Sequence, residues 1–129
     1  MAAEKDFENK VKEFLQSEGI YPSGFKENEM VASPCGWYFK VWGGGYQSSG
    51  IPDLIINVRG HFVGAELKGE TGRPSELQIL NLTRIRESEG FGFVLYPSAF
   101  NEFKEFIRNL KHEEWNRDSI PLIWKNRKR

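Results

Sequence analysis

Residues 50–68 read Gly-Ile-Pro-Asp-Leu-Ile-Ile-Asn-Val-Arg-Gly-His-Phe-Val-Gly-Ala-Glu-Leu-Lys. Residues 53–58 are rich in branched apolar side chains after a leading acid, which predicts a buried strand. Arg59 and Gly60 are typical of a tight turn, and a second strand is expected over residues 61–68. This stretch therefore predicts a β-hairpin, and the rest of the chain is organised around it.

The ends of this hairpin bring three charged side chains together. Side chains alternate between faces along a strand, so Glu66 and Lys68 share one face while Leu67 points to the other. Antiparallel pairing places Asp53, which opens the first strand, beside the end that carries Glu66 and Lys68. Two carboxylates and one ammonium group are therefore expected to converge at one end of a small sheet.

This combination of groups suits a hard divalent cation. Mg²⁺ and Mn²⁺ prefer oxygen ligands, and Mg²⁺ is usually held by one or two carboxylates together with waters and phosphate oxygens. A metal polarises a phosphoryl oxygen and lowers the pKa of a bound water, and Lys68 could orient that water or stabilise the developing charge. The simpler alternative is ordinary solvated residues at strand ends, because an Asp followed by Glu-x-Lys is common by chance.

The order of motifs around the hairpin resembles that of a known nuclease group. Pro52-Asp53 with Glu66-Leu67-Lys68 resembles the PD-(D/E)xK nuclease motif. The wider pattern is similar to the small, stand-alone VRR-NUC domains of phage and bacteria, and the similarity covers about residues 41–96. The residues that carry this wider pattern are Lys40, Tyr46, Gln47, Gly50, Ile51, Pro52, Asp53, Leu54, Glu66, Leu67, Lys68, Gly72, Ser75 and Gln78.

The resemblance implies a restriction-endonuclease-like core and a set of site residues. Asp53 and Glu66 would bind Mg²⁺ or Mn²⁺, with the Leu67 carbonyl as a third ligand. Lys68 would act on the attacking water, and Gln78 would lie near the scissile phosphate. These roles are what membership of the group would mean for this chain.

Two further assignments compete with simpler interpretations. Ser75 and Gln78 have the spacing of a capping box, in which each side chain satisfies a backbone N–H of the first helical turn. One rotamer of Gln78 is not expected to serve both the cap and the catalytic site. In the resembled group a glutamate on the first helix often approaches the metal, and Glu8 matches that pattern better than Glu4. The alternative for Glu8 is a solvated helix acid.

Several polar side chains near the hairpin are candidates for DNA binding. Residues 43–50 read Gly-Gly-Gly-Tyr-Gln-Ser-Ser-Gly, and a loop this flexible can let a phosphate backbone approach closely. Tyr46 offers a ring for stacking, Gln47 offers hydrogen-bonding groups, and Lys40 and Arg73 are candidate phosphate contacts. The alternative for the loop is a glycine hinge with incidental polar residues.

The remaining elements predict an α/β fold with a mixed central sheet flanked by helices. Helices are expected over residues 4–18, 75–88 and 98–111, the last capped by Ser98, and strands over 37–42 and 91–96, with 21–34 as a loop. The last strand should pair parallel to the strand of Glu66. The apolar stripes expected to face the core are Phe7, Val11, Phe14 and Leu15, then Leu77, Leu80, Leu82 and Ile85, then Phe100, Phe103, Phe106, Ile107 and Leu110.

The composition fits one ordinary domain and excludes a basic nucleic-acid coat. The chain has 129 residues, with 18 Lys plus Arg against 18 Asp plus Glu, so a DNA-binding surface must come from local segregation of charge. Cys35 is the single cysteine, which excludes an internal disulfide and fits a reducing cytoplasm. No apolar run approaches the ~20 residues that span a bilayer, and no signal-peptide core is present. A cytoplasmic location, in a bacterial cell or a phage-infected host, is expected.

A single domain is expected over residues 1–129, ending in an aromatic and basic tail at about residues 112–129. The apolar part of this tail could cover the edge of the core or meet a second subunit. Its basic end, Lys-Asn-Arg-Lys-Arg, could touch DNA electrostatically or simply be solvated.

The sequence therefore leads us to expect a metal-dependent endonuclease that hydrolyses DNA phosphodiester bonds. The resemblance implies branched DNA, such as a four-way (Holliday) junction, as the substrate. Cutting both strands of a symmetric junction needs two active centres, so a homodimer is expected. The alternatives from other classes are a nuclease-fold module that binds DNA without cutting it and a subunit that acts only within a larger complex.

Overall fold

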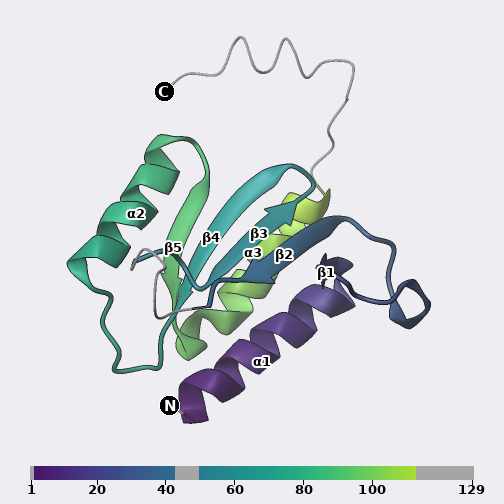
Figure 1. The fold of residues 1–129 in the computed structure, drawn as a ribbon, viewed down its shortest axis with the longest axis horizontal. Coiled ribbons are helices and arrows are strands. Elements are labelled where there is room, and N and C mark those ends of the chain that lie inside the picture. Colours follow the sequence, from purple (N-terminus) through teal and green to yellow (C-terminus); the bar gives the residue numbers. More distant parts are fainter. Residues whose placement is uncertain (1, 43–49, 113–129) are drawn as a thin grey trace.

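The fold was analysed in a computed structural model, which describes residues 2–42 and 50–112. Within these residues three α-helices flank a five-stranded sheet (Figure 1). The elements in chain order are α1 (Ala2–Ser17), β1 (Ile20–Pro22), η1 (Glu27–Glu29), β2 (Gly36–Lys40), β3 (Leu54–Val58), β4 (His61–Leu67), α2 (Glu76–Glu87), β5 (Phe91–Leu95), η2 (Pro97–Ala99) and α3 (Phe100–His112), where η marks a short 3-10 helix. None of the described helices is long and apolar enough to cross a lipid bilayer.

The sheet is mixed, and its strands lie in the order β1-β2-β3-β4-β5. The outer pairs β1–β2 and β4–β5 are parallel, and the inner pairs are antiparallel. Glu66 pairs with Val94, which confirms the predicted parallel pairing after the helical crossover. The α/β fold class with a mixed, helix-flanked sheet is likewise confirmed, and it agrees with a restriction-endonuclease-like core.

The central hairpin forms as its sequence predicts. Arg59 and Gly60 adopt positive φ angles of 50° and 93°, and two such residues give a turn whose twist matches that of the flanking strands. The Gly60 N–H donates to the Asn57 side-chain oxygen at 2.8 Å, which stabilises the turn. The hairpin therefore has a fixed register, and this register sets where Asp53 and Glu66 meet.

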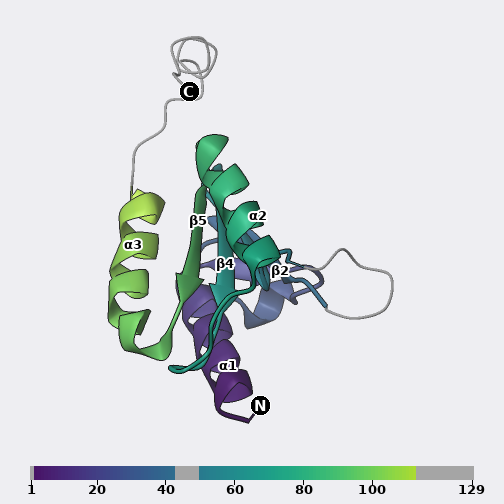
Figure 2. The ribbon, with the colours of Figure 1, turned by 90° about the vertical axis from the view of Figure 1, so that its left-hand side faces the viewer.

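One face of the sheet builds the main core with α1 and α3. Figure 2 shows α3 on one side of the sheet and α2 on the other. The rings of Phe7 and Phe14 lie edge-on to that of Phe100, which joins α1 to α3. The predicted stripe of α1 is confirmed, because Phe7, Val11, Phe14 and Leu15 are all buried. Each such side chain contributes about 1.5–3 kcal/mol of burial free energy.

The helix α2 covers the β4–β5 part of the opposite face and approaches the strands at two glycines. A Cβ atom on Gly92 would lie 2.7 Å from the Leu82 carbonyl oxygen, and one on Gly64 would lie 2.8 Å from the Ile85 side chain. Real side chains do not tolerate such a distance to backbone, so Gly92 permits the close packing, whereas at Gly64 the nearest atom is the end of the Ile85 side chain. The position of α2 matters because its first turn carries Gln78.

The predicted apolar stripe of α2 is wrong for two of its four residues. Leu82 is buried, but Leu77 and Leu80 are 42% and 45% exposed. The helix packs on β5 and part of β4 only, so its contact surface is narrower than a full amphipathic stripe requires. Helical spacing alone does not reveal how far a partner surface extends.

Two local predictions are also wrong. Residues 21 and 22, expected in a loop over 21–34, belong to β1, which pairs parallel to β2. Ser98 does not cap α3: it lies inside η2, where its backbone N–H and its hydroxyl donate to the Glu70 carboxylate. In both places a tertiary partner, which local sequence does not contain, decides the conformation.

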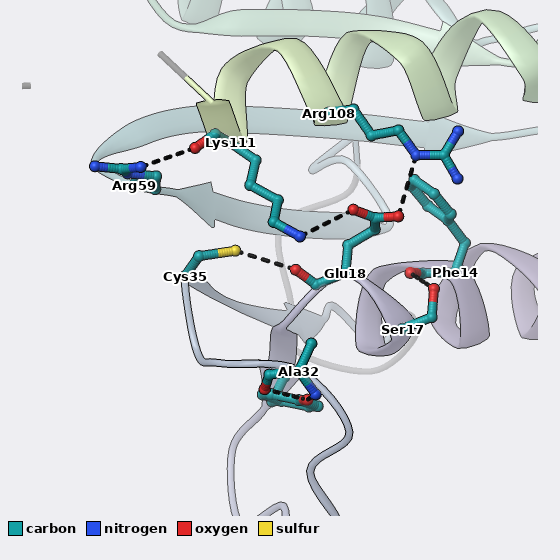
Figure 3. A network of polar contacts seen from close by, with 9 residues as sticks. Phe14, Ser17, Glu18, Ala32, Cys35, Arg59, Arg108 and Lys111 are labelled. Carbon is teal, nitrogen blue, oxygen red and sulfur yellow. Dashed lines mark hydrogen bonds and ion pairs between the residues drawn. The ribbon is translucent and has the colours of Figure 1, made fainter. Parts of the chain in front are cut away.

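A polar network joins the C-terminal ends of α1 and α3 at the end of the sheet that carries the β3–β4 turn (Figure 3). The Glu18 carboxylate accepts hydrogen bonds from Arg108 and Lys111, both at 3.1 Å. The Cys35 thiol donates to the Glu18 carbonyl at 3.2 Å, and Arg59 donates to the Lys111 carbonyl at 3.0 Å. These contacts fix the helices at the end of the sheet remote from Asp53 and Glu66.

Candidate active site

Three charged side chains meet where β3 begins and β4 ends. Leu54 pairs with Ala65, so Asp53 lies just before β3, beside the end of β4. One Asp53 oxygen accepts a hydrogen bond from the Leu67 backbone N–H at 2.8 Å. The Lys68 ammonium lies 3.5 Å from a Glu66 oxygen. The structure thus brings together the residues that the hairpin pattern placed at one end of the sheet.

Glu66 is an unusually situated carboxylate. Its residue surface is only 2% exposed, and its Oε1 atom has no hydrogen-bond partner among the described residues. Burial and the nearby Asp53 charge raise the pKa of Glu66 from 4.5 to about 7, against the lowering influence of Lys68. A buried carboxylate oxygen without a partner costs free energy, and a proton or a cation at that oxygen would offset the cost.

Gln78 serves as a helix cap and as a partner of Glu66 at the same time. Its side-chain oxygen accepts from the Ser75 N–H at 2.7 Å, and its own backbone N–H donates to the Ser75 hydroxyl at 3.1 Å. Its amide nitrogen donates to Glu66 Oε2 at 2.7 Å. One rotamer of Gln78 thus caps α2 and reaches Glu66, because the amide has an oxygen and a nitrogen that act separately. Its role near a scissile phosphate stays a prediction.

Leu67 contributes to the site through its backbone. Its side chain is 1% exposed and belongs to the core, as strand alternation predicts. Its N–H is bonded to Asp53. The Leu67 carbonyl is the atom that the resemblance makes a metal ligand, and the burial of the side chain fixes this part of the backbone beside both acids.

Glu8 lies in a lysine cluster, which we define as Lys5, Lys12 and Lys40 around the Glu8 carboxylate. Glu8 is only 6% exposed, so the alternative of a solvated helix acid is wrong. Lys12 and Lys5 lie 2.8 and 3.2 Å from Glu8 Oε2, and Lys40 contacts Oε1. No group of three acidic, histidine or cysteine side chains suited to a metal occurs in residues 2–42 and 50–112, so Glu8 is not grouped with Asp53 and Glu66.

We expect Glu8→Gln to destabilise the protein by about 3 kcal/mol at pH 7. Burial would raise the pKa of Glu8, but its hydrogen bonds with Lys12, Lys40 and Lys5 outweigh burial and lower the pKa from 4.5 to about 2. A lowered pKa gives stability that is present above pH 4.5 and lost as the pH falls towards 2. Urea unfolding at pH 7 and pH 3 measures the difference.

The control for that experiment is Glu13→Gln, which changes an exposed acid on the same helix. Its effect should stay within about 0.5 kcal/mol at both pH values. An equal loss of stability in Glu8→Gln at pH 7 and pH 3 would contradict the electrostatic explanation, because a loss of packing alone does not depend on the charge of the carboxyl group.

The candidate DNA contacts fall in three places. Tyr46 and Gln47 lie outside the described residues. Arg73 is exposed on the loop between β4 and α2, which is braced by a 3.0 Å hydrogen bond from the Tyr96 hydroxyl to the Gly72 carbonyl. Lys40 is not simply a free surface cation, since it contacts Glu8 and lies 5.4 Å from the centre of the Trp42 ring.

Sequence reasoning missed Lys5 and Lys12 as partners of Glu8. A signal for them was present, because Lys5, Glu8 and Lys12 are three and four residues apart and therefore share one face of α1. The contact of Lys40 with Glu8 had no such signal in the sequence. Lys40 comes from β2, and only the packing of α1 against the sheet brings it to Glu8.

Comparisons with known proteins gave no family: no protein-family model, no curated protein and no solved structure matched this chain. The similarity to VRR-NUC domains therefore remains a resemblance in the order and spacing of motifs.

Proposed function

We propose that the chain is a metal-dependent endonuclease that hydrolyses phosphodiester bonds in DNA, with Asp53, Glu66 and Lys68 at its active centre. The observation that carries the proposal is the state of Glu66, which is buried, has a raised pKa and keeps Oε1 without a hydrogen-bond partner among the described residues. A cation at this point would satisfy that oxygen and offset the repulsion between Glu66 and Asp53.

The donor set fits Mg²⁺ or Mn²⁺. Both ions take oxygen ligands, and Mg²⁺ in particular is often held by only one or two carboxylates. Asp53 and Glu66 would provide these carboxylates, and the Leu67 carbonyl is the proposed third ligand. Because Leu67 N–H already occupies one Asp53 oxygen, the other oxygen of Asp53 is the one we assign to the metal.

Lys68 and Gln78, which lie around these ligands, would have separate roles in the reaction. A bound metal of this kind supplies Lewis-acid polarisation of a phosphoryl oxygen and a water of lowered pKa. Lys68 would orient the attacking water or stabilise the charge that develops on the phosphate. Gln78 would position Glu66, since its amide bonds that carboxylate while its oxygen is held by the helix cap.

The proposed substrate is branched DNA, such as a four-way junction, in the cytoplasm. The support for this choice is the resemblance in motif order described above. Two local features are compatible with DNA binding: the exposed Arg73 lies on the loop after β4, and a cluster of lysines lies on α1 and β2. Both supply positive charge although the chain as a whole carries no net charge.

A cleavage assay tests the proposal directly. Purified protein is incubated with end-labelled linear, flap and four-way junction DNA in the presence of Mg²⁺, Mn²⁺ or EDTA. We expect cleavage of the branched substrates with either metal and none in EDTA. Binding of the same DNA without cleavage under every metal condition would overturn the endonuclease proposal and favour a DNA-binding module or a subunit of a larger complex.

We also propose that the protein is a homodimer, because two active centres are needed to cut both strands of a symmetric junction. The contact surface expected from the sequence, residues 115–124, lies outside the described residues. Light scattering across a dilution series should give twice the monomer mass at micromolar concentration. A monomeric mass combined with nicking of one junction strand would contradict the paired-site arrangement.

A further inference from the structure

The lysine cluster around Glu8 carries more positive charge than its single carboxylate can balance. Lys5, Lys12 and Lys40 all lie within ion-pair distance of Glu8, so these four groups together carry two net positive charges. Two of the lysine side chains are themselves largely buried, with 22% exposure for Lys12 and 18% for Lys40. Like charges held this closely repel each other, and an added anion would reduce that repulsion.

An exposed aromatic ring lies directly beside the cluster. Trp42 follows β2 and is 64% exposed. The ammonium groups of Lys40 and Lys5 lie 5.4 and 5.8 Å from the centre of its ring, which is within the range of cation–π attraction. These contacts hold the indole next to the positive charges, while most of its surface stays accessible to a ligand.

This Trp42–lysine patch, comprising Trp42 and the lysine cluster, is connected to the candidate active site through the backbone. The Val41 N–H donates to the Asp53 carbonyl at 2.8 Å, so the residue between Lys40 and Trp42 is bonded to the proposed metal ligand itself. Lys40 also pairs in register with Leu54, the neighbour of Asp53. The patch and the candidate site therefore lie at the same end of the sheet, with Lys40 on the face that packs against α1 and Glu66 on the face that α2 covers. A strand that contacts both must pass around this end of the sheet.

We propose that the Trp42–lysine patch binds an unpaired nucleotide of the DNA strand that enters the active site. The inference rests on the proposed nuclease function and extends it by naming the form of the DNA. The lysines neutralise backbone phosphates, and the Trp42 ring stacks on a base. The base must be unpaired or at a strand end, because the faces of a base inside a duplex are already covered by its neighbours.

A nucleic acid fits this surface better than an acidic protein segment would. The patch offers an aromatic face and clustered cations together, and single-stranded nucleic acids combine an anionic backbone with flat bases at a regular spacing. An acidic peptide would use the charges but would leave the exposed indole without a matching partner. The position of the patch at the same end of the sheet as Asp53 favours the same choice.

The test measures binding in EDTA, where cleavage is not expected to interfere. Fluorescence anisotropy follows a labelled oligothymidine and a blunt duplex of equal length with wild type, Trp42→Ala, Trp42→Phe and Lys5→Ala/Lys12→Ala. We expect Trp42→Ala to weaken oligothymidine binding about 10-fold. Trp42→Phe should weaken it less, and Trp42→Ala should weaken binding of the duplex less than binding of oligothymidine. The double lysine variant should reduce the dependence of affinity on salt concentration, because fewer counterions are released.

Two matched variants serve as controls. Trp37→Ala removes another exposed tryptophan, on β2, and Lys10→Ala removes an exposed lysine of α1 outside the cluster. Both should bind oligothymidine as wild type does. Thermal melts show whether each variant is folded, and Trp42→Phe reports on the ring if Trp42→Ala fails to fold.

The inference and the nuclease proposal fail in different ways. Unchanged oligothymidine affinity in a folded Trp42→Ala, or an equal loss in Trp37→Ala, overturns the patch while cleavage by wild type still supports the nuclease. Selective loss of oligothymidine binding in Trp42→Ala supports the patch even if wild type cleaves none of the DNA substrates with Mg²⁺ or Mn²⁺, and in that case only the nuclease proposal is overturned.

Discussion

Asp53→Asn and Glu66→Gln are each expected to abolish metal-dependent cleavage of branched DNA, with a loss of at least about 10³-fold in kcat. Each change keeps the shape of the side chain but removes a hard anionic oxygen from the proposed metal site. Single-turnover cleavage of a labelled junction in Mg²⁺, with protein in excess, measures the chemical step.

The matched control is Glu102→Gln, which changes an exposed acid on α3. Its cleavage rate should equal that of wild type. Full activity in either Asp53→Asn or Glu66→Gln would contradict the assignment of that residue as a metal ligand, provided that circular dichroism shows the same fold as wild type. Activity that returns in Asp53→Asn when Mn²⁺ replaces Mg²⁺ would instead support a metal-ligand role, since the amide keeps one oxygen.

The same Glu66→Gln variant should be more stable than wild type at pH 8 in EDTA, by up to about 3 kcal/mol. Burial and the Asp53 charge raise the pKa of Glu66 to about 7. Between pH 4.5 and 7 the folded wild type retains a proton on Glu66 that the unfolded chain has lost. Wild type therefore has its full stability below pH 4.5 and loses part of it as the pH rises through 7. Thermal melts at pH 5 and pH 8 should show the gap between variant and wild type widening with pH.

Lost cleavage together with increased stability in Glu66→Gln is the result expected of a residue in a binding site. An ordinary structural ion pair loses stability when one partner is removed, as we expect for Glu8 among its lysines. Glu66 should behave in the opposite way, because its carboxylate is held beside another acid and one of its oxygens has no hydrogen-bond partner in residues 2–42 and 50–112. A gain in stability together with a loss of activity would mark Glu66 as a residue kept for function at a cost to the fold.

The hairpin and its charged end could be predicted from sequence because the relevant information is local. Branched residues, the Arg59-Gly60 turn and strand alternation together fix the register, and the register alone brings Asp53 beside Glu66. The parallel pairing of β5 follows from the helical crossover between the strands. None of these steps needs a contact between distant parts of the chain to be known beforehand.

The failures share a physical cause, since each depends on what a distant element provides. Leu77 and Leu80 have helical spacing, yet α2 covers only the edge of the sheet and leaves them exposed. Glu8 becomes a buried ion-pair centre because β2 brings Lys40 to it. The bond from Gln78 to Glu66 likewise depends on the approach of α2 to β4, which the capping pattern alone does not contain.

Lys68→Ala is expected to lower kcat for junction cleavage by about 10²–10³-fold while changing the affinity for DNA little. The Lys68 ammonium lies beside Glu66 at the end of β4, where charge would develop on the phosphate and the attacking water. An interaction that strengthens only in the transition state acts on kcat and leaves ground-state binding nearly intact. Single-turnover rates with Mg²⁺ and anisotropy titrations in EDTA measure the two quantities separately.

Arg73→Ala is the matched comparison, because Arg73 is an exposed cation on the loop that follows Lys68. As a phosphate contact it should weaken DNA binding and reduce the salt dependence of affinity, with little effect on the rate at saturating protein. If Lys68→Ala shows the same pattern as Arg73→Ala, a weaker affinity with unchanged kcat, then Lys68 is a binding residue and the attacking water must be activated by another group. The two variants together therefore separate attraction of the DNA from acceleration of the chemical step.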